Sequence, residues 1–374
     1  MKSISLCIAS IFIFQLNLFA QKDTIPAKRI EKSKINYQSY VLTGDTLFAI
    51  NDSGKLVIWS LKKLDTIHFS HNDSKTNYTA IAKDKYNNIF IGAKNGDVFK
   101  LTPSNLYFSH YVKVKYTIRY MCFNSSNKLF LIVANAIYDP VSKKHWTKFE
   151  NHATGLIQIK KSYIFFHKKT SKYFSMPQYA FLDSKDRWWM TASYGEFGGE
   201  VQIFNTNTES VVSNKFNALN PGTIFPKSVF EDNNENIYIT SGLQHFMNSG
   251  KIYRIDKNRN VVEICDGKIR PNTTLNDANT GRNDEEFIGP GAYNKIDNSL
   301  YFVTTTGFYK AALADNIKPE FLFNTNLSWD REPLAIGVAM SVIKIDFTSD
   351  NKLLFLTKNN GFGLYDGKGL VFIK

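Results

Sequence analysis

The sequence is poor in cysteine and proline. Of its 374 residues only three are cysteine and ten are proline, and no stretch is of low complexity, which argues against a disordered chain. Two of the cysteines, Cys122 and Cys265, fall in different repeats of the pattern that organises the chain, one in a first strand and the other in a last strand. We therefore expect two separate buried thiols and no disulfide.

Long hydrophobic runs are also missing, so no segment is expected to cross a membrane in the mature protein. Leu6–Phe14, near the N-terminus, is too short to span a bilayer. Lys2 before it and Leu18–Ala20 after it are typical of a secretory signal peptide that is cleaved before Gln21. The sequence thus predicts an exported protein, periplasmic or secreted, with no transmembrane segment after cleavage.

Acidic residues are outnumbered by basic ones. Lys and Arg total 46 against 33 Asp and Glu, which gives a formal net charge of +13. Such a surplus favours polyanionic partners. We expect an acidic polysaccharide or an envelope or extracellular protein as partner, and no nucleic acid. The alternative is a generally basic protein without an anionic partner, because the lysines are mostly scattered.

Known catalytic motifs are absent. The sequence has no Gly-x-Ser-x-Gly elbow, His-Glu-x-x-His motif, phosphate-binding loop, Cys-x-x-Cys pair or sialidase-type Asp box. One polar segment is rich in oxygen ligands but does not match the spacing of a known calcium loop: Asn276, Asp277, Asn279, Arg282, Asp284, Glu285 and Glu286. We therefore expect no metal and no cofactor, and we favour a binding protein over an enzyme.

The sequence does contain a four-part pattern that is repeated seven times between Ser39 and Lys374. The second part of each repeat is a short apolar and aromatic run: Thr46–Ile50, Asn88–Gly92, Lys128–Ile132, Arg187–Thr191, Asn236–Thr240, Ser299–Val303 and Lys352–Leu356. A further strand and a polar turn precede this run, and a turn with two more strands follows it. This pattern predicts an all-β fold, a seven-bladed β-propeller of four-stranded antiparallel blades.

One segment does not fit the repeat. Gly155–Ile159 and Ser162–Phe166 are typical of one more hairpin, which we interpret as an insertion; a degenerate eighth blade is the alternative. The predicted organisation is a signal peptide at 1–20, an N-terminal extension at 21–36 and a propeller at 37–374 with the hairpin inserted at about 153–177. How the ring closes stays open, because both terminal blades have a full set of strands.

The order of polar turn, Asn-aromatic-Ile, Asn-Gly and apolar strand resembles the regulator-propeller repeats in periplasmic ectodomains of bacterial two-component sensors. The resemblance covers most of residues 39–373 and implies the propeller fold. Asn87, Asp186 and Asn236 stand near the position where that family has a turn glycine, and the family's Trp occurs only as Trp188–Trp189. Because the sequence shows no membrane span and no kinase, the resemblance implies neither ligand sensing nor any functional residue.

The long connections are predicted to share one end of the blades. In an antiparallel blade, second-to-third and fourth-to-first connections leave at one end, and the other two kinds leave at the opposite end. Six expanded segments are of the first two kinds: Ala192–Gly198, Ser241–Ser249, His152–Pro177, Asn214–Pro226, Asp266–Pro290 and Asn324–Met340. We call this end the loop face and the opposite end the short-turn face, and we expect binding on the loop face.

Two groups of residues are candidates for ligand contact on the loop face. Aromatic rings with Arg suit a sugar or an aromatic ligand: Trp189, Tyr194, Phe197, His245, Phe246, Arg282, Trp329 and Arg331. A basic hairpin with interleaved aromatic residues suits an anionic polymer: Lys160, Lys161, Lys168, Lys169 and Lys172. The structural alternatives are packing of loops onto the rim and a solvated strand pair.

A polysaccharide lyase acting on acidic glycan is the enzymatic alternative to an exported binding module. Its chemistry needs a Tyr or His for proton transfer and a cation that neutralises the uronate. Candidate residues are His245, Tyr194, Tyr238 and Arg254, with Arg331 as a second choice for the cation. No motif in the sequence brings these residues together.

Overall fold

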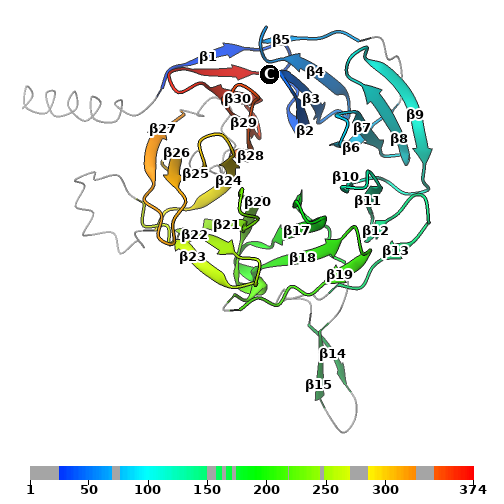
Figure 1. Ribbon diagram of the computed structural model, residues 1–374, viewed down its shortest axis with the longest axis vertical. Helices are drawn as coiled ribbons and strands as arrows, with labels where there is room; N and C mark the ends of the chain where they lie inside the picture. The colour runs from blue at the N-terminus through cyan, green and yellow to red at the C-terminus, as the bar shows by residue number, and fades with distance from the viewer. Residues whose placement is uncertain are drawn as a thin grey trace, which may run out of the picture.

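The computed structural model of the protein describes residues 25–69, 76–149, 157–161, 166–170, 174–217, 219–244, 248–269, 285–325 and 341–374. Over these ranges the chain is almost entirely β-strand, with two short 3-10 helices, η2 (Gly195–Phe197) and η3 (Pro221–Thr223). Seven sheets stand around a central axis, and within each sheet the first strand is innermost (Figure 1). The predicted seven-bladed β-propeller of four-stranded antiparallel blades is confirmed.

The blades follow one another around the ring in chain order (Figure 1). Their strands, from the first to the fourth, are as follows: in blade 1, β2 (Tyr37–Thr43), β3 (Thr46–Asn51), β4 (Leu56–Ser60) and β5 (Asp65–Thr66); in blade 2, β6 (Tyr78–Lys83), β7 (Ile89–Ala93), β8 (Asp97–Thr102) and β9 (Tyr107–Lys113); in blade 3, β10 (Tyr120–Phe123), β11 (Leu129–Val133), β12 (Ala136–Tyr138) and β13 (His145–Trp146); in blade 4, β16 (Tyr179–Leu182), β17 (Arg187–Ser193), β18 (Gly199–Asn205) and β19 (Ser210–Val212); in blade 5, β20 (Pro226–Glu231), β21 (Ile237–Gln244), β22 (Asn248–Ile255) and β23 (Val261–Cys265); in blade 6, β24 (Ile288–Asn294), β25 (Ser299–Thr304), β26 (Phe308–Ala312) and β27 (Glu320–Phe323); in blade 7, β28 (Val342–Phe347), β29 (Leu353–Thr357), β30 (Phe362–Tyr365) and β31 (Leu370–Ile373).

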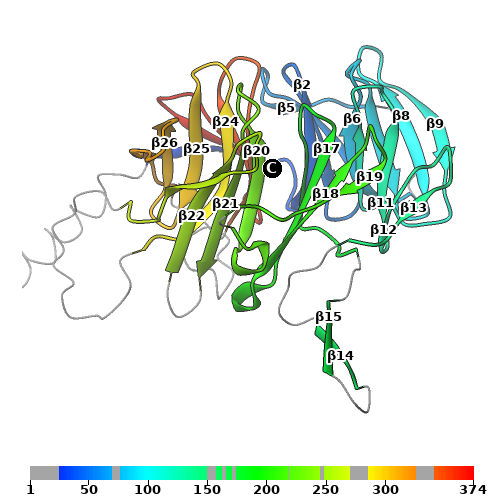
Figure 2. The same cartoon turned by 60° about the horizontal axis from the view of Figure 1, so that its bottom comes forward.

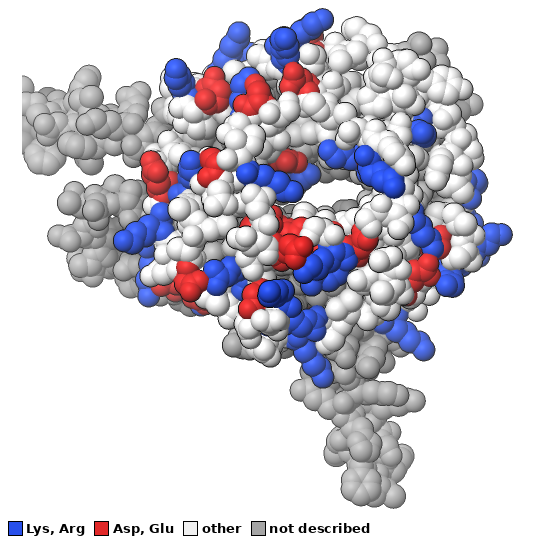
Figure 3. Space-filling model, in the orientation of Figure 1, with Lys and Arg blue, Asp and Glu red and all other residues white. Residues whose placement is uncertain are grey.

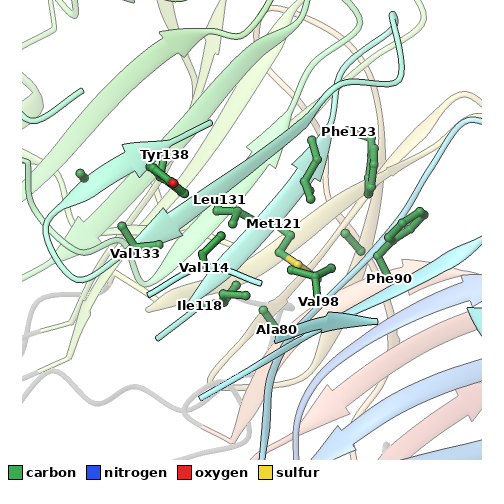
Figure 4. Packing of buried hydrophobic residues seen from close by; sticks show 13 residues of the cluster. Ala80, Phe90, Val98, Val114, Ile118, Met121, Phe123, Leu131, Val133 and Tyr138 are labelled. Atoms are coloured by element: carbon green, nitrogen blue, oxygen red, sulfur yellow. The ribbon is translucent and has the colours of Figure 1, made fainter. Parts of the chain in front are cut away.

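The second strand of a blade is apolar on both sides because neighbouring blades cover both of its faces. All residues of β7, β11 and β29 are buried, whereas the outer strand β9 is mostly exposed. Figure 4 shows the contact between blades 2 and 3, where Phe90 and Val98 share a buried cluster with Met121 and Leu131. Burying one such side chain contributes about 1.5–3 kcal/mol. Face-to-face packing of blades therefore stabilises the ring.

Many first-to-second turns are closed by a buried polar side chain at their first residue. In five blades this side chain accepts the backbone N–H four residues later, at 2.8–2.9 Å: Asp84, Asn124, Asp183, Asp232 and Thr348. The residue before each donor has a left-handed backbone, with φ between 60° and 65°: Asn87, Asn127, Asp186, Glu235 and Asn351. The placement of Asn236 at the turn-glycine position is therefore wrong, because Glu235 occupies it.

These turns also connect neighbouring blades on the short-turn face. Ser125 of blade 3 donates from its backbone N–H and its hydroxyl to the carboxylate of Asp186 in blade 4, at 2.8 and 2.5 Å. Ser184 of blade 4 makes the corresponding two bonds to Glu231 of blade 5, at 2.9 and 2.8 Å. Figure 3 views this face, and acidic and basic side chains lie side by side around its central opening. Many of its polar groups thus bond to one another.

The ring closes through a strand that precedes blade 1. β1 (Ala27–Ile30) pairs in parallel with β31, so blade 7 gains a fifth strand (Figure 1). Residues 31–36, which we call the strap, then cross from β1 to the start of β2. The backbone N–H of Lys32 donates to the carbonyl of Lys374, and the N–H of Lys374 donates to the carbonyl of Ile30 at 3.0 Å. Because β1 runs parallel to the fourth strand β31, the strap leaves blade 7 at the same end as a fourth-to-first connection and lies on the loop face.

The hairpin between blades 3 and 4 is separate from the ring. β14 (Ile157–Lys161) and β15 (Phe166–Thr170) are antiparallel and form a two-stranded sheet of their own (Figure 2). Since neither strand pairs with a propeller strand in the described part of the chain, the hairpin does not make an eighth blade.

The predicted signal peptide lies outside the described residues. None of the helices among the described residues has the length and hydropathy needed to span a membrane. Cys122 and Cys265 are buried and unpaired, so the expectation of two separate thiols is confirmed. Burial raises the pKa of Cys122 well above its ordinary value and raises that of Cys265 to about 11, which keeps both thiols protonated and poorly reactive.

Candidate functional site

Much of the loop face falls in gaps between the described ranges. Several predicted ligand residues lie outside the described residues: His245, Phe246, Arg282, Trp329 and Arg331. Lys172 of the basic hairpin lies outside them as well. For four other lysines only the strand that carries them is described: Lys160 and Lys161 on β14, and Lys168 and Lys169 on β15. The roles assigned to these residues stay predictions.

Trp189 and Tyr238 lie at the short-turn end of their blades and are buried. Trp189 is 2% exposed, and its indole N–H donates to Asp183 at 2.8 Å. Tyr238 is 1% exposed, and its hydroxyl donates to Asp232 at 3.0 Å. Burial raises the pKa of Tyr238, and the charge of Asp232 raises it further. Each aromatic residue is thus an anchor for a turn carboxylate six residues earlier, and neither presents its ring to a ligand.

Among the described lyase candidates, Tyr238 and Arg254 do not lie near Tyr194, because they are at the short-turn end of blade 5 and Tyr194 is on the loop face. Tyr238 is paired with Arg254 in the register of β21 and β22, and Arg254 forms a 2.7 Å ion pair with Asp315. From Tyr238 the strand β21 runs on to Gln244, a distance of about 20 Å at 3.3 Å per residue. Tyr238 and Arg254 are therefore far from Gln244 at the loop-face end of β21, the last described residue before His245 in the sequence.

Tyr194 and Phe197 do lie on the loop face, in the connection from β17 to β18. Phe197 is 65% exposed. The hydroxyl of Tyr194 donates to Glu200 at 3.1 Å, and the amide of Gln202 donates to the other oxygen of that carboxylate at 3.0 Å. Glu200 is 1% exposed, so a buried polar network holds this loop. Burial raises the pKa of Tyr194, which keeps its hydroxyl neutral and able to donate.

A cavity of about 460 Å³ lies on the loop face between the strap and blade 7. We call it the seam pocket. Its apolar lining is Ile30 and Phe372, and its polar lining is Arg29, Glu31, Lys34, Asn36, Asn359, Asn360 and Lys374. The volume is within the range of roughly 300–1,000 Å³ that is usual for small-molecule sites. The pocket exists only because β1 and the strap close the ring at this point.

The side chains of the seam pocket carry more positive than negative charge. Three cations, Arg29, Lys34 and Lys374, line it together with one carboxylate, Glu31. The ammonium of Lys374 also donates to the carbonyl of Asn359 at 2.5 Å, which positions that charge at the wall of the pocket. A concave site lined mainly by one sign of charge concentrates ligands of the opposite sign.

Two amide oxygens in the seam pocket have no hydrogen-bond donor among the described residues. Asn360 is 2% exposed, and its backbone N–H donates to the hydroxyl of Thr357 at 2.9 Å, but its Oδ1 accepts nothing there. The Oδ1 of Asn36 also lacks a donor, although its Nδ2 donates to Asn359 at 3.4 Å. An unpaired buried polar atom costs about 1–3 kcal/mol. Less than 1 Å² of either oxygen is accessible, so the O–H or N–H group of a ligand reaches them only when the asparagine side chains turn toward the pocket.

Sequence reasoning missed both the seam pocket and Lys227. Lys227 occupies an irregularity in the pairing of β20 with β21, at the loop-face end of an innermost strand, and its ammonium lies 5.6 Å from the ring centroid of Phe287. Burial lowers the pKa of Lys227. A bulge of this kind leaves no mark in a single sequence. The seam pocket draws its residues from both ends of the chain, which no local pattern connects.

Comparisons with known proteins support the fold and assign no family. No protein-family model matches the chain, and no curated protein matches it. A solved structure of a catalytically inactive virginiamycin B lyase from Staphylococcus aureus, with quinupristin, is similar with a TM-score of 0.57 and 9% identity, covering 92% of this chain and 99% of that one. YCF48 bound to D1 peptide is similar with a TM-score of 0.56 and 10% identity, covering 91% and 97%.

A third similar structure is the β-propeller domain of Cps50 (Swd1) from Myceliophteria thermophila, with a TM-score of 0.53 and 9% identity, covering 90% of this chain and 97% of that one. At such identities the likeness shows the propeller fold alone. The regulator-propeller family therefore stays a resemblance in sequence pattern.

Proposed function

We propose that this protein is an exported binding module whose ligand, an acidic glycan or another anionic envelope component, is held on the loop face. The observation that carries the proposal is the difference between the two faces. On the short-turn face many polar side chains bond to one another, whereas the described part of the loop face contains a cavity in which three of the four charged lining residues are cations. The formal net charge of +13 supports an anionic ligand.

Export is part of the same proposal. It is supported by the charged start, short apolar run and small-residue cleavage site within residues 1–20. The fold is compatible with binding, because YCF48, a propeller with a similar fold, is seen with a bound peptide.

The direct test is a binding screen of the mature protein against acidic polysaccharides, by glycan array and by thermal shift. Neutral polysaccharides of the same backbone are the matched controls. We expect binding to uronate-rich polymers, weakened by salt because the attraction is electrostatic. We also expect weaker binding when Trp329 and Arg331 are both replaced by alanine. Failure to bind any acidic polymer would overturn the proposal.

A lyase acting on acidic glycan is the second candidate, favoured by the similarity in fold to virginiamycin B lyase. Tyr194, His245 and Arg331 would supply the proton transfer and the cation. The raised pKa of Tyr194 counts against its use as a base near neutral pH. The test is the ultraviolet absorbance of unsaturated product after uronate polymers are added. A flat trace across such polymers removes the lyase candidate.

A further inference from the structure

We propose that the seam pocket is a subsite for a single uronate sugar, whose carboxylate is held by Arg29 and Lys34 and whose hydroxyls donate to Asn360 and Asn36. This inference rests on the proposed function, which supplies the acidic glycan, and it assigns that glycan a place on the loop face. Four features of the pocket support the assignment: its charge, its amide oxygens, its apolar wall and its position at the seam of the ring.

The charge of the pocket suits one carboxylate. A guanidinium can hold a carboxylate with two parallel hydrogen bonds, and an ammonium adds a point charge beside it. Arg29 and Lys34 come from β1 and the strap, on one side of the cavity. Glu31 stands among them and repels a second anionic group. The lining therefore favours a ligand with one negative charge per ring over a densely charged one.

The amide oxygens require a ligand that also donates hydrogen bonds. The Oδ1 atoms of Asn360 and Asn36 are buried and lack donors among the described residues. Sulfate offers only acceptors, so it would satisfy the cations and leave both oxygens unpaired. A sugar ring carries a carboxylate and several hydroxyls on one small frame. It can satisfy both halves of the pocket at once when the Asn36 and Asn360 side chains turn toward it, because less than 1 Å² of each oxygen is accessible in the unbound protein.

The apolar part of the lining completes the match. Phe372 is 3% exposed and, with Ile30, gives the cavity an apolar wall. A sugar has apolar C–H groups as well as hydroxyls, and sites that bind small molecules usually combine apolar walls with a few placed polar groups. A simple inorganic anion gains nothing from such a wall.

The location of the pocket adds a consequence for stability. Arg29 belongs to β1 and Lys34 to the strap, whereas Asn360 and Lys374 belong to blade 7. A ligand that contacts both sides bridges the seam of the ring. Because it binds the closed ring and not the open chain, it raises the midpoint of unfolding, by an amount that grows with the logarithm of its concentration relative to its dissociation constant.

The experiment is calorimetric titration of the mature protein with trigalacturonate and with the carboxyl-reduced neutral trisaccharide. We expect the wild type to bind the acidic ligand at least tenfold more tightly than the neutral one. The Arg29→Ala/Lys34→Ala double variant should bind the acidic ligand at least tenfold more weakly than the wild type does, and its affinity for the neutral ligand should change little. Asn360→Leu should weaken both ligands about equally, because the hydroxyls are common to them.

Lys28→Ala is the matched control, since Lys28 is the exposed neighbour of Arg29 on β1 and is not in the pocket lining. Its affinity should stay within twofold of the wild type. Lys34→Glu, at an exposed position, tests the same point if the double variant fails to fold. Unfolding midpoints measured with each ligand report the bridging of the seam independently of heat release.

The outcomes separate this inference from the proposed function. If the wild type binds acidic glycan but the Arg29, Lys34 and Asn360 variants bind it equally well, the subsite is overturned and the proposed function stands. If Lys28→Ala loses as much as the double variant, general charge and not the pocket explains the binding, and the subsite is again overturned. If galactose 6-phosphate binds more tightly than the uronate, the assignment to a carboxylate is overturned. If the wild type binds no acidic sugar, both proposals fall.

Discussion

At the short-turn end of blade 4 and at the seam, two polar side chains are buried to almost the same degree. Asp183 is 4% exposed and Asn360 is 2% exposed. The carboxylate of Asp183 accepts the backbone N–H groups of Lys185 and Arg187, the guanidinium of Arg187 and the indole of Trp189, at 2.6–3.0 Å. The Oδ1 of Asn360 accepts no donor from the described residues. The fold itself satisfies the first side chain and leaves the second for a ligand.

This difference shows that burial of a polar residue does not by itself indicate function. A buried polar group is normally paired, so the informative one is the group whose pairing is incomplete. Asp84 and Asp232 repeat the two backbone contacts of Asp183 in blades 2 and 5. Recurrence in several blades marks these carboxylates as part of the repeat, whereas Asn360 and its cavity belong to the seam alone.

The largest effect is expected from Asp183→Ala. Four donors, among them the buried indole of Trp189, lose their acceptor, and breaking a buried charge pair of this kind costs about 3–5 kcal/mol of unfolding free energy. Asp256→Ala is the control, because Asp256 makes the same turn contacts at 2.8–2.9 Å in an exposed turn. Urea unfolding measures both variants. A loss for Asp256→Ala as large as that for Asp183→Ala would contradict the role given to burial.

The second effect concerns the closing strand. Ile30 of β1 packs against the buried cluster between blades 7 and 1, so Ile30→Asp places a charge in a partly buried apolar contact. We expect a loss of about 2 kcal/mol and faster amide exchange in β31. Lys28→Asp, on the exposed side of the same strand, should change the unfolding free energy by less than about 0.5 kcal/mol. Equal losses would mean that β1 contributes nothing specific to closure.

A smaller effect is expected at Glu209, which connects blades 3 and 4 on the short-turn face. Hydrogen bonds from Lys128 at 2.5 Å and from Lys144 at 3.0 Å lower the pKa of Glu209. A lowered carboxylate pKa adds stability above the unfolded value of about 4.3, and this stability is lost as pH falls through the folded pKa. Glu209→Gln should therefore cost at most about 1 kcal/mol at pH 7.

The pH dependence gives the check on this prediction. The difference between wild type and Glu209→Gln in urea unfolding should shrink as pH is lowered from 7 to 3. Glu320→Gln, at an exposed glutamate on β27, is the control. A difference that stays constant with pH would show that the ion pairs of Glu209 do not stabilise the folded protein.

The smallest effect tests the seam directly. Asn360→Leu removes an oxygen that has no donor among the described residues, so the unfolding free energy without ligand should change by less than about 1 kcal/mol, in either direction. Asn124→Leu is the same change at a residue that is 4% exposed and whose Oδ1 accepts the N–H of Lys128 at 2.8 Å. It should cost about 1–3 kcal/mol. If both variants lose equally, Asn360 is an ordinary structural residue.

The blades could be predicted from the sequence because each strand has a local signature. Runs such as Leu129–Val133 are apolar at every position since both sides of the strand are covered, and the polar turns between strands recur at the same place. The exact turn geometry was less accessible: Glu235 and not Asn236 adopts the left-handed backbone, a choice that depends on where the Asp232 side chain accepts its hydrogen bonds.

The candidate site was predicted poorly, for physical reasons. Trp189 and Tyr238 are aromatic residues of the kind that line ligand sites. A Trp or Tyr six residues after a turn Asp, however, is placed to donate a hydrogen bond to that Asp inside the blade. That spacing is a signal that could have been read. The seam pocket has no such signal, because its walls come from the first and last strands and meet only when the ring is closed.

The pairing of β1 with β31 also determines when the ring can close during synthesis. Ala27 is synthesised more than three hundred residues before its partner Leu370, so β1 cannot pair with β31 until the end of blade 7 has been synthesised. The entropy of closing so large a loop rises only slowly with its length, so the delay is a matter of time more than of final stability. The seam pocket is lined by residues of β1, the strap and blade 7. A ligand can therefore bind there only after the last blade has been synthesised and the ring has closed.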